Sequence, residues 1–489
     1  MKTGIEMDQK TLDHDAEQLK SLGLNSEFDR SMSFWENFSL GFTYLSPVVG
    51  VYSVFALAIQ AGGPPMIWNY FFVGLGQFLV CLVFGEVVSQ YPISGGIYPW
   101  SLRLVGERFA WMSAWVYAWA LFTSVAAVAV GGAPFLNNLL GIELGNTGFI
   151  WIAIGMILIS TLLNLSGTKL LAQVAFFGFA CELVGAILVG GYLLFFAKVN
   201  SINILWDTFT FGDGMSYFPA FLASSVAAMF CYYGFEACGD VAEETPNASS
   251  AIPKSMRMTI YIGGGAAIFI CLALLLALPN VDKAISGEDA DPVTTTLTSA
   301  MGITGYRMVI VVVMISFLSC LLSLQAAASR LLFSFARDGM IFGSQYLNHL
   351  SKKGKVPTKA LLVTGIIPIV ITGIGHWLQD TVTTIISFAS CGIYVAFQMV
   401  VFGALYARLK GWKPAGSFTL GRYGFLINVL AFIYGIAAVS NMVWPRSPDE
   451  PWFINYGMIF TSLVVVSTGF FYLLFAKPHL RKKYAKTIH

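Results

Sequence analysis

Charged side chains are scarce in this 489-residue sequence. Lys, Arg, Asp and Glu together make up 11% of the residues, and hydrophobic residues make up 56%. A soluble domain carries about 25% charged residues and about 45–50% apolar ones. One aqueous core stops growing beyond about 250–300 residues, so it cannot hide this much apolar surface. The scarcity of charge therefore excludes an ordinary soluble domain and indicates a chain that is embedded largely in lipid.

Several other features are missing. The net charge of +2 is too small to indicate a nucleic-acid partner, and none is expected. No GxSxG, HExxH or Walker sequence stands in a suitable context, so neither an enzyme nor an ATP-driven pump is indicated, and no cofactor is expected. Residues 1–32 are polar and mixed in charge, unlike a cleavable signal peptide. We expect the first apolar run to direct insertion itself.

The cysteines also exclude two kinds of site. All seven lie inside apolar stretches, and none forms a CxxC pair or a Cys/His ligand spacing. A disulfide framework and a metal site are therefore both unexpected.

What is present is a series of long apolar runs. A helix needs about 20 largely apolar residues to cross a bilayer. The runs are continuous rather than alternating, which favours helices over barrel strands. The sequence predicts an all-α integral membrane protein with twelve transmembrane helices, at 36–61, 66–90, 109–137, 148–166, 168–197, 217–242, 258–280, 305–337, 358–376, 380–408, 423–444 and 453–476.

The basic residues predict the orientation of these spans. Loops that stay in the cytoplasm carry an excess of Lys and Arg. With the N-terminus inside, all but four of the 28 basic residues fall on the cytoplasmic side, and the four outer ones are Lys198, Lys283, Arg307 and Arg446. We therefore expect a multi-pass protein of the cell membrane (plasma or inner membrane) with both termini in the cytoplasm.

Two spans carry residues that interrupt a helix. The first contains Ser46, Pro47, Val48, Val49, Gly50, Val51 and Tyr52, and the sixth contains Tyr232, Tyr233, Gly234 and Phe235. Proline removes a backbone donor, and glycine weakens a helix by about 1 kcal/mol. Each span taken alone also fits a kinked but continuous helix. Because the two spans begin successive five-helix units, the pair predicts an inverted repeat with a substrate site at the breaks.

Specific motifs support this reading. Glu86 is followed by Tyr91-Pro92-Ile93-Ser94-Gly95-Gly96-Ile97-Tyr98-Pro99-Trp100. After the sixth span come Glu243-Glu244-Thr245-Pro246-Asn247 and Ile252-Pro253-Lys254-Ser255, and the eighth ends in Ser329-Arg330-Leu331-Leu332 and Arg337-Asp338-Gly339. In these motifs the chain resembles the amino acid–polyamine–organocation superfamily of permeases, and within it the amino acid/choline branch. That branch usually reads G-x-x-x-G-x-G in its first helix, where this chain has Ser46, Gly50 and Tyr52.

The resemblance implies a leucine-transporter-type fold of 5+5 inverted repeats with two peripheral helices. The expected organisation is a cytoplasmic tail (1–35), a first repeat (36–197), a second repeat (217–408), peripheral helices 11 and 12 (423–476) and a basic cytoplasmic tail (477–489). The resemblance also implies alternating access around helices 1, 3, 6, 8 and 10.

Two acids within the spans are functional candidates, because ionisable groups in a bilayer are costly. Many relatives carry a lysine that mimics a sodium ion where this chain has Glu182. A carboxyl there could titrate with transport, bind a cation or only hold an interhelical hydrogen bond. Glu236 lies in the second break and is expected to bond the freed backbone amides.

Three further residues are candidates by position. Phe230 matches an aromatic residue that closes over substrate in related exchangers, so it is a candidate gate. Ser319 and Ser323 lie one turn apart and face one side of the eighth span, where hydroxyls in related folds help to form a sodium site. Serines in such places more often only bond across helices.

The sequence thus predicts a secondary active transporter of an amino acid or related amine, either symporter or exchanger, with a proton or sodium ion as its possible coupling ion. Its expected partners are that small molecule and the lipid bilayer. Two alternatives stay open. One is a transport-inactive nutrient sensor of the same fold, and the other is a carrier for an amine such as ethanolamine, choline or a diamine.

Overall fold

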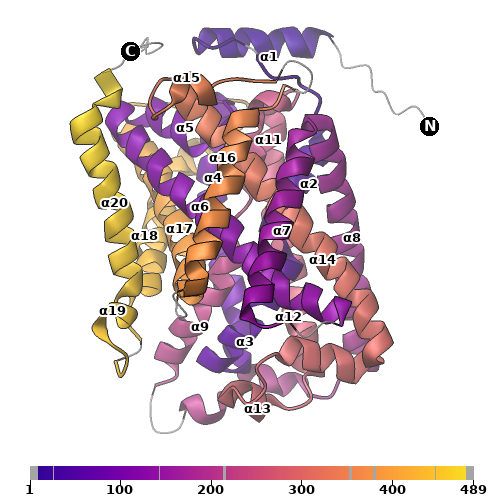
Figure 1. The fold of residues 1–489 in the computed structure, drawn as a ribbon. Helices are drawn as coiled ribbons and strands as arrows, with labels where there is room; N and C mark the ends of the chain where they lie inside the picture. The colour runs from indigo at the N-terminus through magenta and orange to yellow at the C-terminus, as the bar shows by residue number, and fades with distance from the viewer. Residues whose placement is uncertain are drawn as a thin grey trace.

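The computed structural model describes residues 9–25, 27–141, 144–212, 216–351, 355–377, 381–446 and 448–480. The described residues are 81% helical and contain no strand. The long helices run side by side as one bundle, and α1 (Gln9–Ser21) lies across one end of it (Figure 1).

Eleven helical segments in the described part of the chain are long and apolar enough to span a membrane. The helices that form them are α2 (Phe34–Leu45) with α3 (Pro47–Gly62), α4 (Ile67–Gln90), α6 (Glu107–Leu140), α7 (Asn146–Leu165), α8 (Thr168–Phe196), α11 (Ala248–Met258) continuing through a π-helical turn, η5 (Thr259–Gly263), into α12 (Gly264–Ala277), α14 (Pro292–Arg337), α16 (Thr358–Trp377), α17 (Thr381–Leu409), α18 (Gly424–Val443) and α20 (Gly457–Ala476). These segments agree with the predicted multi-pass membrane fold.

The sixth predicted span differs from the rest. Instead of one helix over 217–242, the chain forms α9 (Phe218–Phe230) and then, after a non-helical segment, the single turn α10 (Ala237–Asp240). With 13 residues, α9 is about 20 Å long, too short to cross the bilayer alone. The described residues therefore do not confirm a twelfth spanning helix over 217–242, while the expected interruption is present.

The eighth predicted span is preceded by a short helical segment that was not predicted from the sequence. Helix α14 starts at Pro292 rather than near 305, and Asp291 accepts a hydrogen bond from Thr294 N as its N-cap. Gly302 interrupts it with φ 66° and ψ 176°, so the first turns form a separate segment that bends away from the span. Hydropathy missed that segment because it is rich in threonine.

Burial separates the centre of the bundle from its edge. In the most apolar stretch of the α2–α3 span 83% of residues are buried, compared with 11% in α20. Figure 1 shows α18 and α20 along one edge of the bundle, which agrees with the two peripheral helices that the resemblance implied. The broken α2–α3 span is therefore surrounded by protein.

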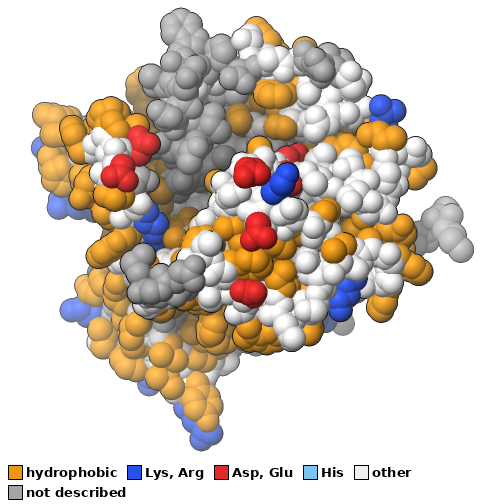
Figure 2. Space-filling view, turned by 90° about the horizontal axis from the view of Figure 1, so that it is seen from below, with side chains coloured by type: hydrophobic (Ala, Val, Ile, Leu, Met, Phe, Trp, Pro, Cys, Tyr) orange, Lys and Arg blue, Asp and Glu red, His pale blue; other side chains and the backbone are white. Residues whose placement is uncertain are grey.

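The two ends of the bundle differ in their side chains. The end opposite α1 carries α13 (Val281–Ser286), and Asp282 and Glu288 are exposed there. Figure 2, which views this end, shows a group of acidic side chains near its middle, while most basic side chains in the view lie towards the rim. By the Lys and Arg rule this is the expected outer face.

This orientation can be tested by thiol labelling. Glu288→Cys should react from outside intact cells with a membrane-impermeant maleimide, because its side chain is exposed on the acidic end. Lys413→Cys, between α17 and α18, should react only after the cells are permeabilised. The parent protein provides the background from its native cysteines, and the reverse pattern would invert the assignment.

Candidate substrate site between two helix breaks

The first break is confined to one residue. Ser46 separates α2 from α3 in a left-handed conformation with φ 41° and ψ 86°. Pro47 has no N–H to continue the α2 hydrogen-bond ladder, and its ring disfavours a helical conformation in the residue before it. The expected loop over Ser46–Tyr52 is therefore shorter than predicted, because the residues from Pro47 to Tyr52 form the first turns of α3.

The Glu182 carboxylate from α8 lies at this break. Its Oε1 accepts hydrogen bonds from Ser46 Oγ at 2.7 Å and from Val48 N at 2.9 Å. The side chain is completely buried. Because the first amides of a helix are unpaired and carry partial positive charge, a carboxylate is favoured there. Glu182 thus makes an interhelical bond to the broken helix itself.

The second break follows α9. Gly234 has φ 115°, a region that side chains rarely adopt. A Cβ at Gly234 would lie 2.4 Å from Leu45 N and 2.8 Å from Leu45 Cα, and one at Gly50 would lie 2.9 Å from Cys231 Sγ. The backbones of the two breaks are therefore in direct contact, with only glycine able to occupy the crossing at Gly234.

Two acids belong to the second break. Glu236 Oε2 accepts a hydrogen bond from Gly234 N at 2.7 Å, which ties the break to its own side chain. The Tyr117 hydroxyl of α6 lies 3.3 Å from Glu236 Oε1 and 3.2 Å from Asp240 Oδ2. Both acids are fully buried. Asp240 was not among the sequence candidates for the site.

The predicted aromatic residues point in two directions. The ring of Phe230 packs edge-on against Tyr233 at 5.7 Å, and the phenol of Tyr233 lies beside Ser124 of α6 and Ser390 of α17. The side chains of Phe230 and Tyr233 therefore lie at the breaks. Tyr232 instead packs against Gly74 and Gly264, and Phe235 packs between Phe84 and Phe397.

The remaining candidate residues lie on α3 and on α14. Tyr52 packs towards Phe135 of α6, with their ring centroids 6.4 Å apart. Val49 N lies 3.4 Å from Ser46 Oγ, and Val51 is buried. Of the two serines, Ser323 bonds Thr43 Oγ1 at 2.8 Å, while Ser319 donates to Ile315 O of its own helix and packs on Gly178.

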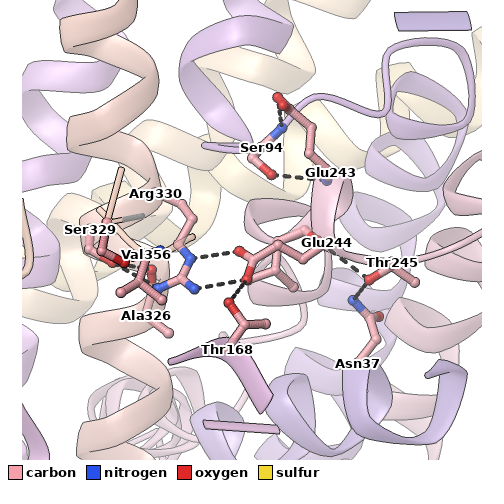
Figure 3. A network of polar contacts seen from close by, with 12 residues as sticks. Asn37, Ser94, Thr168, Glu243, Glu244, Thr245, Ala326, Ser329, Arg330 and Val356 are labelled. Carbon is pink, nitrogen blue, oxygen red and sulfur yellow. Dashed lines mark hydrogen bonds and ion pairs between the residues drawn. The ribbon is translucent and has the colours of Figure 1, made fainter. Parts of the chain in front are cut away.

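A network of ion pairs closes the end of the bundle nearer α1. Arg330 donates from Nε to Glu244 Oε1 at 2.7 Å and from Nη2 to Glu244 Oε2 at 2.9 Å, and both side chains are completely buried. Figure 3 shows this fork with Thr168, whose hydroxyl also donates to Glu244, and with Glu243 against Ser94. Apart from Thr168, these residues belong to the motifs quoted from the sequence, which do not show which of them pair.

The N-terminal segment is fastened to the same place. Asp15 in α1 accepts a hydrogen bond from Asn247 N at 2.7 Å and pairs with Arg30 at 3.3 Å. Arg30 Nη1 in turn donates to Thr245 O, and Met32 N donates to Glu244 O at 3.0 Å. Asp15, Arg30 and Met32 therefore attach the N-terminal segment to the loop that carries Glu244.

Removing one partner of the Arg330–Glu244 pair should strongly destabilise the fold. Glu244→Leu leaves a buried guanidinium without its carboxylate, which costs about 3–5 kcal/mol. The double variant Glu244→Leu/Arg330→Met should recover most of the lost Tm in detergent, because no buried charge is stranded. Glu288→Leu on the exposed acidic end is the control, and an unchanged Tm in Glu244→Leu would show that the pair is not desolvated.

Several known proteins are similar to this chain over most of its length. The amino acid permease family matches residues 32–487. The chain is similar to the amino-acid permease BAT1 of Arabidopsis thaliana, with 23% identity over 94% of each protein. It is also similar to an uncharacterized amino-acid permease of Schizosaccharomyces pombe, with 24% identity over 96% of this chain and 87% of the relative. The BAT1 homolog of Oryza sativa subsp. japonica is 25% identical over 85% of each.

The match covers all of the long apolar helices, both breaks and the ion-pair network. These relatives indicate a membrane transporter rather than an enzyme. The chain belongs to the amino acid permease family of the amino acid–polyamine–organocation superfamily.

Proposed function

We propose that this permease is a secondary active transporter that moves a small amino acid or related amine across the cell membrane by alternating access. The observation that carries the proposal is the direct contact between the two helix breaks, at Ser46 and Gly234, inside the bundle. Broken spans at corresponding positions of two repeats are the typical place of a transporter's substrate site. The breaks supply oriented backbone groups and buried acids without a catalytic constellation.

Alternating access requires that each end of the bundle opens in turn. The end near α1 is closed by the Arg330–Glu244 fork and the Arg337–Glu243 pair. To open this end, the carrier must separate these pairs and let water reach them. Substrate can drive such a change only through a difference in its binding free energy between the two states. Contacts at the breaks, which join α2–α3 to α9–α10, are placed to supply that difference.

The coupling ion is proposed to act at the first break. Glu182 joins α8 to Ser46 and Val48, so a change in its charge alters a contact that spans two helices. A proton is the simplest ion for a buried carboxyl. Sodium is the alternative, with the hydroxyls of Ser319 and Ser323 nearby on α14 as further oxygen ligands.

A transport-inactive nutrient sensor is the second candidate function, because it would retain the same fold and motifs. Purified protein in liposomes separates the two. We expect saturable, gradient-dependent uptake of at least one labelled amino acid or amine. Binding of a ligand without any uptake would instead identify a sensor.

The packing of the breaks gives a first test of the site. Gly50→Ala places a methyl group against Cys231, and such overpacking costs about 1–3 kcal/mol. We expect uptake to fall about tenfold, with partial recovery in Gly50→Ala/Cys231→Ala. Gly265→Ala on α12, where an added Cβ meets nothing within 4 Å, is the matched control. Normal uptake in Gly50→Ala would place the site elsewhere.

The role of Glu182 gives a second test. Glu182→Gln keeps the shape and an acceptor oxygen for Ser46 and Val48 but carries no charge. We expect the variant to insert and purify normally, and to lose either the pH dependence of uptake or the preference for cationic substrates. Initial uptake rates with an imposed pH gradient measure the first, and competition assays measure the second. If Glu182→Gln kept the wild-type uptake rate, pH profile and selectivity, Glu182 would serve only in helix packing.

A further inference from the structure

The donors at the start of α3 are all occupied by the protein's own atoms. Pro47 has no N–H, and Val48 N donates to the Glu182 carboxylate at 2.9 Å. Val49 N is directed to Ser46 Oγ at 3.4 Å, and Gly50 N donates to Ser46 O at 2.8 Å. A helix N-terminus is a ready place for an anion. Here the anion is a side chain of the same protein, so a substrate carboxylate finds no free donor in this turn.

The Glu182 carboxylate uses only one of its two oxygens in its hydrogen bonds to the start of α3. Glu182 Oε1 accepts both bonds, whereas Oε2 is buried and has no hydrogen-bond partner within the described residues. A buried polar atom left unpaired costs about 1–3 kcal/mol, and more when it is charged. An ammonium group offers three donors and a positive charge. An ammonium group would therefore supply the hydrogen-bond partner that Glu182 Oε2 is missing.

Within the described parts of the chain, the acids at the two breaks have no basic partner of their own, since Arg330, which acts on Asp240 electrostatically, is already paired with Glu244. Glu182, Glu236 and Asp240 are all buried there, and none of them takes part in any of the four ion pairs found among the described residues. Asp240 Oδ1 is likewise buried and has no hydrogen-bond partner among the residues that the structure describes. An α-amino acid whose ammonium bound at Glu182 would bring its own carboxylate close to this acid, and like charges at short range in a dry site repel strongly. An amine with no carboxylate on the carbon that bears the nitrogen brings only the opposite charge to this place.

We propose that Glu182 takes the place of the substrate's α-carboxylate, so that this carrier recognises amines with no carboxylate on the carbon that bears the nitrogen. The ammonium binds at Glu182 Oε2, between the break at Ser46 and α14. This inference rests on the proposed function for the location of the site. It extends that function by excluding ordinary α-amino acids as preferred substrates.

Matched pairs of ligands test the inference by binding alone. Full-length protein in detergent is titrated with L-serine and ethanolamine, L-lysine and cadaverine, and L-glutamate and γ-aminobutyrate, and the shift in Tm is recorded. A charge-assisted hydrogen bond contributes about 1.5–3 kcal/mol. We therefore expect at least one amine of a pair to bind about 10–100-fold more tightly than its α-amino acid. Tighter binding of the α-amino acid in every responsive pair would overturn the inference.

Two variants at the same position separate charge from shape. Glu182→Gln should weaken amine binding about 10–100-fold without improving α-amino acid binding, because the amide still occupies Val48 N. Glu182→Ala frees Val48 N and Ser46 Oγ, so the preference should shift towards the α-amino acid by about tenfold or more. Cys181→Ala, the adjacent residue on α8, is the control and should keep the wild-type preference. An unchanged preference in both Glu182 variants would overturn the inference.

The outcome also distinguishes this inference from the proposed function. Amine binding without uptake would support the recognition by Glu182 and contradict transport, whereas uptake led by α-amino acids would support transport and contradict the inference. A Tm increase with NaCl over KCl that is lost in Glu182→Gln, with no response to any amine, would assign the carboxylate to sodium and overturn it.

Discussion

The structure depends on the contact between one buried carboxylate and the start of one helix. Ser46 turns the chain out of α2 in a left-handed conformation, and α3 begins at once with a proline. The amides exposed by that break are costly in a membrane interior unless they are bonded. Glu182 supplies the bond from α8, and burial of its own charge is offset by the positive end of α3. The break and the acid therefore stabilise each other.

The second break extends the same arrangement. Gly234 lets the backbone after α9 approach Leu45 closely enough to exclude any side chain, and Glu236 bonds the amide that this geometry frees. Each break thus contains a carboxylate that satisfies its own backbone. What differs is the remaining oxygen. Glu236 shares the Tyr117 hydroxyl with Asp240, whereas the second oxygen of Glu182 has no hydrogen-bond partner among the described residues. Because of this unpaired oxygen, we expect a ligand to bind at the first break.

The closed end of the bundle depends on a different balance. Arg330 and Glu244 are completely buried and form a two-point fork, and Thr168 satisfies a further lone pair. A buried pair of this kind contributes little net stability, yet breaking it is expensive. It therefore suits a gate whose closed state must be well defined. The segment from Asp15 to Met32 adds contacts to the same loop, so opening this end also involves the N-terminal helix.

Much of this organisation could be predicted from the sequence, because length and apolarity determine which segments cross a bilayer and the Gly and Pro residues indicate where helices break. The sequence did not show that only Ser46 leaves the helix, since this depends on Pro47 starting α3 at once. The partners of Glu182 lie more than 130 residues away in the chain, and nothing local encodes which face of α8 meets α3. The Thr-rich start of α14 and the docking of Asp15 were missed because polar segments carry no hydropathy signal.

The most direct test of the account is an experimental map of the purified protein with a bound amine such as γ-aminobutyrate. Ligand density is expected between the two breaks, with the ammonium within about 3 Å of Glu182 Oε2 and the first turn of α3 still bonded to Oε1. Ligand density outside the breaks would contradict this expectation. So would a substrate carboxylate seated on Val48 N with Glu182 turned away.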